Sequence, residues 1–586
     1  MIKRVLERPA LIFAAVLFWK IVLLIVSAQP VPSNDAFFYD GPVVNFLLHG
    51  KYANPSLALA LPISGNEVFC AYPPLYQFVL LGWLSIFGVS AVAAMFFHLF
   101  LFALFMFLLL KIFRHLNLTR WPASIAGTFL LVITFHDRPD SLAHVLGTAA
   151  IYCWIRSRTS LDPGGKRMPL NEITRFESQN RDFSSSSSPP QEERVGERRS
   201  GVSTLEKSLK FRSIFPMSWR SGGWTWAAAG FVVLALASGL QIGALYFLLI
   251  WIGMLLNALV AKENFPLAPM MALVLLPIGL LALVVFGFPH LWTGFLEHAH
   301  QTPALTGWRL PRIAEILKTV RTVPGILMVV ALMPFWLQRR DKVRAAGKQA
   351  LWLVTLTCAL AAFAVVAASL FVLTPNSVFF AGYLQPLILG CFLGMFPFVM
   401  ERPVEAQGLT DHSERALLDG PARFAFWAFL GIAAVGSIRA IGMSTWGLAC
   451  AADVSYAAAI DRVSAELRAC PRQSATVLSS AYLYEAALHD NVRCFHSDWL
   501  APARRGGSNM DLEALIALKP SKILLTQFDY FRRFETVFAQ LKQRQEIARF
   551  ELVNFARTPT PDSFPSLQKV VQHISWAPVV VSLSWQ

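Results

Sequence analysis

The sequence predicts a polytopic α-helical membrane protein of about eleven transmembrane helices, with a small α/β domain in its C-terminal part. The first observation is composition: 55% of the residues are hydrophobic and 15% are charged, whereas soluble proteins carry about 25% charged residues. The second is a series of apolar runs, each near the length that crosses a bilayer. The third is a change of pattern beyond residue 446, where short β-like runs such as "KILLT" alternate with helical runs such as "DLEALIAL".

The apolar runs set the expected positions of the spanning helices. A hydrocarbon core about 30 Å thick requires about 20 apolar residues in a helix. The run 74–88 is shorter and follows a proline pair, so it fits a helix that lies in the membrane interface. The spans are expected at 10–29, 90–113, 121–136, 141–156, 224–240, 241–261, 266–289, 321–338, 350–373, 378–399 and 423–443.

The basic residues predict the orientation of the chain. The formal net charge is +15, but Lys and Arg gather beside the apolar runs, as in "QRRDKVRAAGK" at 338–348. This is the positive-inside pattern of a membrane protein, and it requires no nucleic-acid partner. It places the N-terminus in the cytoplasm and, after an odd number of spans, the C-terminal domain outside. The first apolar run lacks a small-x-small cleavage site and is therefore expected to remain as the first helix.

The chain divides into four expected regions. Residues 1–156 form an N-terminal transmembrane module whose outer loops carry the candidate catalytic groups, and 223–445 form a second transmembrane module. Between them, 157–222 contain "SSSSSPPQEERVGERRS", which is typical of a disordered loop and here would be cytoplasmic. Residues 446–586 form the extracytoplasmic α/β domain, in which no GxGxxG or GxxxxGK[ST] motif indicates a nucleotide site.

Acidic residues stand in two loops of the expected outer face. The first loop carries Asp35 and Asp40, and the turn "FHDRPDSLAH" carries Asp137, Arg138 and Asp140. Each group has an alternative interpretation: loop acids are commonly just solvated, and a carboxylate at a helix N-terminus stabilises the helix dipole. Together they suit a reaction at a lipid phosphate, because a carboxylate accepts a proton or binds a divalent metal and an Arg holds phosphate.

The order of short motifs around these acids resembles that of the GT-C glycosyltransferases, in particular the branch with the protein O-mannosyltransferases and the lipid A aminoarabinose transferase. The motifs cover about 30–160 and, beyond them, the resemblance is one of general architecture. The matching residues are Asp35 with Tyr39, Gly50-Lys51-Tyr52, Tyr72-Pro73-Pro74-Leu75-Tyr76, Phe87-Gly88 and Arg138-Pro139-Asp140.

The resemblance implies a GT-C-like fold and an inverting glycosyltransferase of the bacterial inner membrane. The donor would be a polyprenyl-phosphate sugar and the acceptor a glycan, a lipid or a protein. Asp35 would be the catalytic base and Asp140 would assist it. The substrate-binding residues would be Arg138, Asp137, Asp40, Tyr39, Tyr72 and Arg309.

The chain departs from the family pattern at one position. Ala36 follows Asp35, where many members have Glu. Whether Asp40 or Glu67 supplies a second carboxylate therefore stays open, as does the use of a divalent metal.

Other polar residues of the outer loops have weaker signals. Glu297, His298 and His300 lack the i, i+4 spacing of a helical zinc pair. Interfacial anchoring is the favoured role for Arg309 with Arg312 and for the segment with Asn376, Tyr383 and Gln385. For His136 and His144 we favour hydrogen bonds within the helix pair.

The alternative function is a transporter or flippase of a lipid-linked or small polar substrate. Such a protein should show charged residues within its spans and two matching halves with broken helices. The predicted spans carry few charges and show no two-half repeat, which favours the enzyme.

Overall fold

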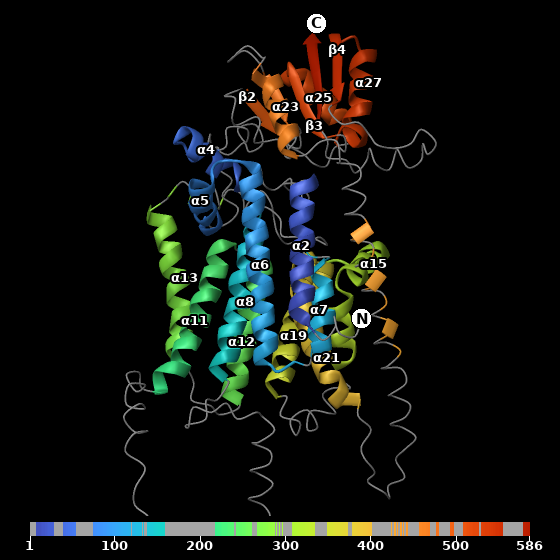
Figure 1. The fold of residues 1–586 in the computed structure, drawn as a ribbon. Helices are drawn as coiled ribbons and strands as arrows, with labels where there is room; N and C mark the ends of the chain where they lie inside the picture. The colour runs from blue at the N-terminus through green and yellow to red at the C-terminus, as the bar shows by residue number, and fades with distance from the viewer. Residues whose placement is uncertain are drawn as a thin grey trace, which may run out of the picture.

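A computed structural model gives the fold. The structure describes residues 8–27, 39–53, 74–118, 120–131, 133, 138–158, 217–239, 242–260, 267–287, 308–333, 349–372, 378–400, 456–468, 476–479, 493–496, 508–526, 529–554 and 578–586, with single residues between 289–296 and 424–442. It consists of a helical bundle and a sheet domain that lies beyond the end of the bundle occupied by the short helices α4 and α5 (Figure 1).

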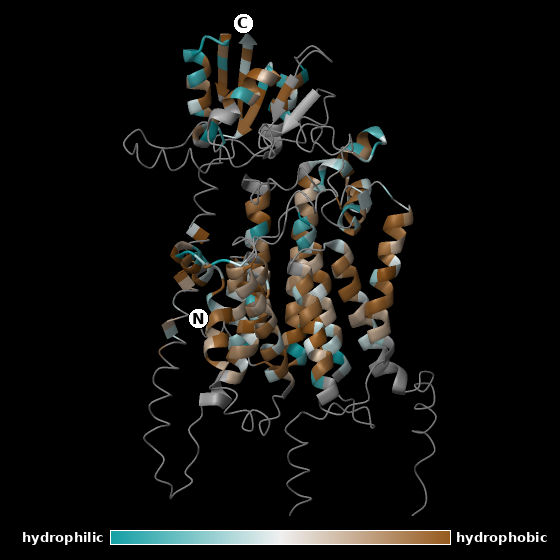
Figure 2. Cartoon of the chain, turned by 180° about the vertical axis from the view of Figure 1, so that it is seen from behind, coloured by the Kyte–Doolittle hydropathy of each residue, from teal (hydrophilic) through white to brown (hydrophobic). Residues whose placement is uncertain are grey.

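The bundle is made of long apolar helices with short helices at their ends. Aromatic and aliphatic side chains from most of its helices form one continuous core, and Figure 2 shows the apolar character of the bundle. The long helices are α2 (Pro9–Ser27), α6 (Ala91–His115), α8 (Pro139–Arg158), α11 (Met217–Ser238), α12 (Ile242–Val260), α13 (Leu267–Gly287), α19 (Gln349–Phe371) and α21 (Gln385–Met400). The short ones are α4 (Gly41–His49), α5 (Leu75–Phe87), α7 (Arg120–Thr128), η2 (Phe129–Leu131), α15 (Ile313–Thr322), α16 (Pro324–Ala331) and α20 (Val378–Gly382).

Local sequence signals explain where α4, α5 and α6 begin and end. Pro42 lies in the first turn of α4, and Gly50 ends that helix with a left-handed φ of 71°. Gly88 ends α5 with φ 92°, a conformation that favours glycine. The Ser90 hydroxyl accepts a hydrogen bond from the Ala93 amide at 3.1 Å and so caps α6. The predicted separate helix over 74–88 is therefore present as α5, which packs on α4 and α6.

Three of the described helices are long and apolar enough to cross a membrane: Val92–His115, Pro269–Gly287 and Ala350–Phe371. Five shorter apolar helices accompany them, at Pro9–Leu24, Leu75–Phe87, Gly223–Ser238, Ala244–Asn257 and Gln385–Met395. The expected span at 423–443 lies outside the continuously described residues. The total of eleven spans remains a prediction.

Two predicted spans differ from the observed helices. The helix expected at 121–136 ends at Thr128 and continues only as the 3-10 turn η2. There the Leu131 carbonyl accepts a hydrogen bond from the ammonium of Lys20 at 3.1 Å. In a continuing helix this carbonyl would accept from a backbone amide of the next turn. The helix expected at 321–338 is broken at Val323, whose φ of −128° is not helical, and Pro324 starts α16.

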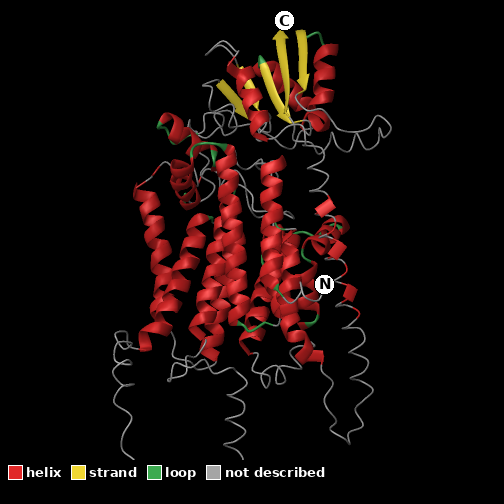
Figure 3. Cartoon of the chain, viewed as in Figure 1, coloured by secondary structure: helices red, strands yellow, loops and turns green. Residues whose placement is uncertain are grey.

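The sheet domain contains all the described strands (Figure 3). They are β1 (Thr476–Ser479), β2 (Arg493–His496), β3 (Lys522–Thr526), β4 (Ile547–Asn554) and β5 (Pro578–Trp585), in the order β2-β1-β3-β5-β4. β1 pairs in parallel with β2 and β3, whereas β5 is antiparallel to both β3 and β4.

Helices cover both faces of the sheet. Leu515 of α25 (Ser508–Leu518) and Phe538 of α27 (Glu535–Gln543) share a core with Ile523 and Val581 of the sheet. α23 (Tyr456–Arg468) packs on β5, and its Glu466 pairs with Lys522 of β3 at 3.0 Å. The described residues between 456 and 586 therefore form a sheet with helices packed on it.

Candidate functional site

An ion pair lies at the N-terminal end of α8. The Arg138 Nε and an Asp140 carboxylate oxygen are 3.2 Å apart, and the Asp140 side chain is only 1% exposed. Pro139 between them begins the helix, and Asp140 lies in its first turn, where a carboxylate also interacts favourably with the helix dipole. The guanidinium of Arg138 lies 5.7 Å from the centre of the Phe380 ring of α20. Asp140 is thus held between a cation and a helix N-terminus.

An aromatic and polar group continues along α8 from this pair. His144, one turn after Asp140, is fully buried, and its Nδ1 lies 3.3 Å from the Tyr246 hydroxyl of α12. Its ring packs on Tyr383, which follows α20, with centroids 4.1 Å apart. The hydrogen bond of His144 therefore goes to α12, whereas one to the 121–136 segment was predicted. Interfacial anchoring by Tyr383 is wrong, because its ring is buried against His144.

A second buried polar group lies near the N-terminal end of α6. The Tyr76 hydroxyl of α5 donates to an Asp40 carboxylate oxygen at 3.0 Å and lies 3.0 Å from Nε2 of His98 in α6. All three side chains are buried. Tyr39 packs edge-on against the Tyr76 ring, with centroids 6.4 Å apart. Asp40 and Tyr39, both predicted to bind substrate, lie inside this packed group, and their role toward a substrate stays a prediction.

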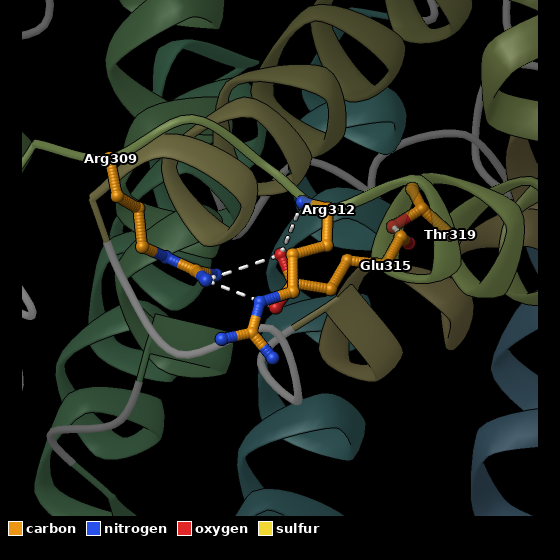
Figure 4. Close-up of polar contacts among 4 residues, drawn as sticks. All are labelled: Arg309, Arg312, Glu315 and Thr319. Atoms are coloured by element: carbon orange, nitrogen blue, oxygen red, sulfur yellow. Dashed lines mark hydrogen bonds and ion pairs between the residues drawn. The ribbon is translucent and has the colours of Figure 1, made fainter.

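A third group surrounds the N-terminus of α15 (Figure 4). Nη1 of Arg309 contacts both carboxylate oxygens of Glu315, at 3.0 and 3.2 Å, and the Arg312 amide donates to the same carboxylate at 3.1 Å. The hydrogen bond from Arg309 and that from Arg312 hold the pKa of Glu315 below its ordinary value. The Nε and Nη2 atoms of Arg309 are buried and have no hydrogen-bond partner among the described residues. Arg309 is therefore oriented by Glu315 and has two buried nitrogens whose N–H groups can donate to an anion.

Helix contacts connect the three groups. α5, which carries Tyr76, packs on α8, which carries Asp140. α15 packs on α20, whose Phe380 faces Arg138. The Arg309 amide also donates to the Phe371 carbonyl at the end of α19, at 2.9 Å. Arg138 and Arg309 are consequently linked through the α19–α20 region.

Several predicted residues lie outside the described part of the chain. These are Asp35, Asp137, Tyr72, Glu67, His136, Asn376 and the Glu297–His298–His300 cluster. The role of Asp35 as base stays a prediction. Within the described ranges, no group of three His, Cys, Asp or Glu side chains is close enough to hold a metal ion.

Sequence reasoning missed three residues of these groups, His98, Tyr246 and Glu315, and it identified Tyr76 only as part of the motif that ends at that residue. The Tyr76–His98 contact joins α5 and α6, and the His144–Tyr246 contact joins helices about a hundred residues apart. Only Glu315 had a local signal, since it stands three residues after Arg312 in the capping-box position.

Comparison with known proteins gives structural similarities only. No protein-family model matches the chain, and no curated protein matches it in sequence. The structure of ArnT from Cupriavidus metallidurans bound to undecaprenyl phosphate is similar at 14% identity and a TM-score of 0.46, covering 98% of this chain and 97% of that one. The apo oligosaccharyltransferase of Archaeoglobus fulgidus is similar at 11% identity and a TM-score of 0.41, covering 89% and 70%.

Both of these proteins have the GT-C fold, which is the fold that the motifs of the first outer loop resemble. The function proposed for this chain therefore rests on its own residues.

Proposed function

We propose that this chain is an integral membrane glycosyltransferase of the bacterial inner membrane. It would transfer a sugar from a polyprenyl-phosphate donor to an acceptor on the extracytoplasmic face, with inversion. The observation that carries the proposal is the ion pair at the start of α8 between the buried Asp140 and the partly buried Arg138. Buried charges at membrane depth are expensive and mark functional sites by default. The motif order that runs from Asp35 to Asp140 supports the same reaction.

The reaction is a single displacement at the anomeric carbon. The acceptor oxygen or nitrogen attacks that carbon from the side opposite the phosphate, and a carboxylate takes the acceptor proton. The bond between the anomeric carbon and the phosphate oxygen breaks, and the polyprenyl phosphate leaves with the electron pair. Because one displacement occurs, the configuration inverts. We assign the base to Asp35, because it occupies the acidic position of the first loop, and the assisting carboxylate to Asp140.

Arg309 suits the departing phosphate. Its Nη1 is fixed by Glu315, while Nε and Nη2 have no partner among the described residues. A guanidinium keeps its charge at every relevant pH and can present two parallel N–H groups to phosphate oxygens. The ion pair with Glu315 would therefore orient Arg309 before the donor arrives.

The test measures transfer of labelled sugar from a polyprenyl phosphate by the purified protein in lipid nanodiscs. Wild type is compared with Asp35→Asn and Asp140→Asn, and Glu513→Gln is the control because Glu513 pairs on the exposed surface of the sheet domain. Asp35→Asn should lose about 10²–10⁴-fold in kcat, the usual contribution of a general base. Asp140→Asn should also lose activity, and Glu513→Gln should match wild type.

Arg309→Gln separates the binding of the phosphate from proton transfer. This variant should raise the KM for the donor and also lower kcat, because the leaving phosphate is more charged in the transition state. Full activity of Asp35→Asn would remove that residue from catalysis. Movement of lipid between leaflets by the wild-type protein, without sugar transfer, would favour the flippase.

A further inference from the structure

The helix α15 exposes an apolar side and buries a polar residue. Thr319 is buried, and Glu315 points toward Arg309 (Figure 4). The apolar side chains of α15 and of the segment just before it are instead 42% to 84% exposed: Trp308, Leu310, Ile313, Ile316 and Leu317. A contiguous apolar patch of this kind is a contact surface and not a surface for water.

We propose that α15 lies in the outer interface of the bilayer, with its exposed apolar side in contact with lipid acyl chains. This goes beyond sugar transfer and does not depend on it. α15 has ten residues, or roughly 15 Å at 1.5 Å per residue, which is half of what a spanning helix needs. A helix this short with one apolar side lies along the interface.

The depth of α15 follows from its contact with α19. The apolar span Ala350–Phe371 contains 22 residues, or roughly 33 Å at 1.5 Å per residue, so its end at Phe371 reaches the edge of a hydrocarbon core of about 30 Å. Trp308 stacks on Phe371 with centroids 5.6 Å apart, and the Arg309 amide donates to the Phe371 carbonyl. Trp308 is thus at the depth where tryptophan side chains gather in membrane proteins.

The charged residues beside the apolar side favour contact with a lipid surface over contact with another protein. Arg312 and Lys318 are exposed at the flanks of α15, where their cationic ends can reach headgroup phosphates while their stems contact apolar groups. α15 packs on α16, α19 and α20. In this arrangement Arg309 lies at headgroup depth, between the lipid-facing helix and the helix bundle.

Nitroxide labels at single cysteines test the proposal. The seven natural cysteines are replaced first, and the labels are placed at Ile313→Cys and Leu317→Cys. Lys318→Cys is the matched control on the same helix, and Glu513→Cys is the control for full exposure to water. The protein is reconstituted in nanodiscs of phosphatidylcholine and phosphatidylglycerol, and collision rates with oxygen and with a water-soluble nickel chelate are measured.

Oxygen concentrates in acyl chains and the chelate is excluded from them. The ratio of oxygen to nickel collisions should be several-fold higher at 313 and 317 than at 318. The difference from position 513 should be larger still. Equal nickel accessibility at 317 and 513 would overturn the proposal. Protection from both reagents, with spin–spin broadening between copies, would also overturn it and would assign the surface to a second copy. Because the labelled positions are exposed, these substitutions remove no core packing, and elution as a single species confirms the fold of each variant.

Discussion

Tyr76 shows how one hydroxyl can hold three elements together. It lies 3.0 Å from both Asp40, which precedes α4, and His98 of α6. An ionised carboxylate only accepts hydrogen bonds, so the single hydroxyl hydrogen goes to Asp40. Nε2 of His98 must then carry the hydrogen that it donates to the Tyr76 oxygen. His98 therefore donates to Tyr76, and Tyr76 donates to Asp40. Asp40 stands five residues after Asp35 in the sequence.

Removing that hydroxyl should destabilise the protein in a way that depends on Asp40. Tyr76→Phe keeps the ring but removes a hydrogen bond to a charged group, which contributes about 1.5–3 kcal/mol. The combined cost of Tyr76→Phe and Asp40→Ala should fall short of the sum of the single costs by about 0.5–3 kcal/mol. Chemical unfolding in detergent measures the four free energies of unfolding. Ser85→Ala removes an exposed hydroxyl from the same helix and should change little; strict additivity would contradict the coupling.

At the scale of elements, the sequence predicts the uniform apolar helices well and the breaks poorly. Four long helices lie within a few residues of the expected spans: α6, α12, α13 and α19. Their length and apolar composition can be recognised directly in the sequence. The end of α7 depends on Lys20, about 110 residues away, which binds the Leu131 carbonyl. Composition does not reveal such a partner. The break before α16 had a local signal, Pro324, that the continuous apolar run concealed.

The same limit applies to the candidate site. Arg138 and Asp140 are two residues apart, and one short motif identified both as candidate site residues. Tyr383 and His144 are far apart in sequence, and the burial of Tyr383 depends on the packing of α8, α12 and α20. Residues whose role follows from local spacing could be found, and residues that depend on helix packing could not.

The contact between α8 and α12 should be sensitive to one methyl group. A Cβ added at Gly147 of α8 would overlap the Phe247 ring of α12. Gly147→Ala should therefore destabilise the protein by about 1–3 kcal/mol, the usual cost of overpacking. It should also reduce activity, because His144 and Asp140 lie on the same helix.

Gly230 of α11 is the matched control. It has nothing within 4 Å of an added Cβ, so Gly230→Ala should be neutral or stabilise by about 0.5–1 kcal/mol. Thermal unfolding of both variants in the same detergent compares them. Equal stability of the two variants would show that α8 and α12 are not in close contact at Gly147.

At the scale of the whole molecule, charge and architecture favour the same orientation. Arg114 lies in the last turn of α6, Arg120 starts α7 and Arg158 ends α8. These helix ends lie at the end of the bundle opposite α4 and α5 (Figure 1). The sheet domain lies beyond the α4 and α5 end. Basic residues stay in the cytoplasm during insertion, so we expect the sheet domain and α15 on the extracytoplasmic side.

Reporter fusions test that orientation directly. Alkaline phosphatase, which folds only outside the cytoplasm because it needs disulfides, should be active when fused after Gln586 and inactive when fused after Arg158. Green fluorescent protein at the same two positions should give the reverse result, which controls for expression. A fluorescent and phosphatase-negative fusion at Gln586 would place the sheet domain in the cytoplasm. That result would require an even number of spans. The sheet domain would then lie on the opposite side of the membrane from the face on which Asp35 and Asp140 are expected to act.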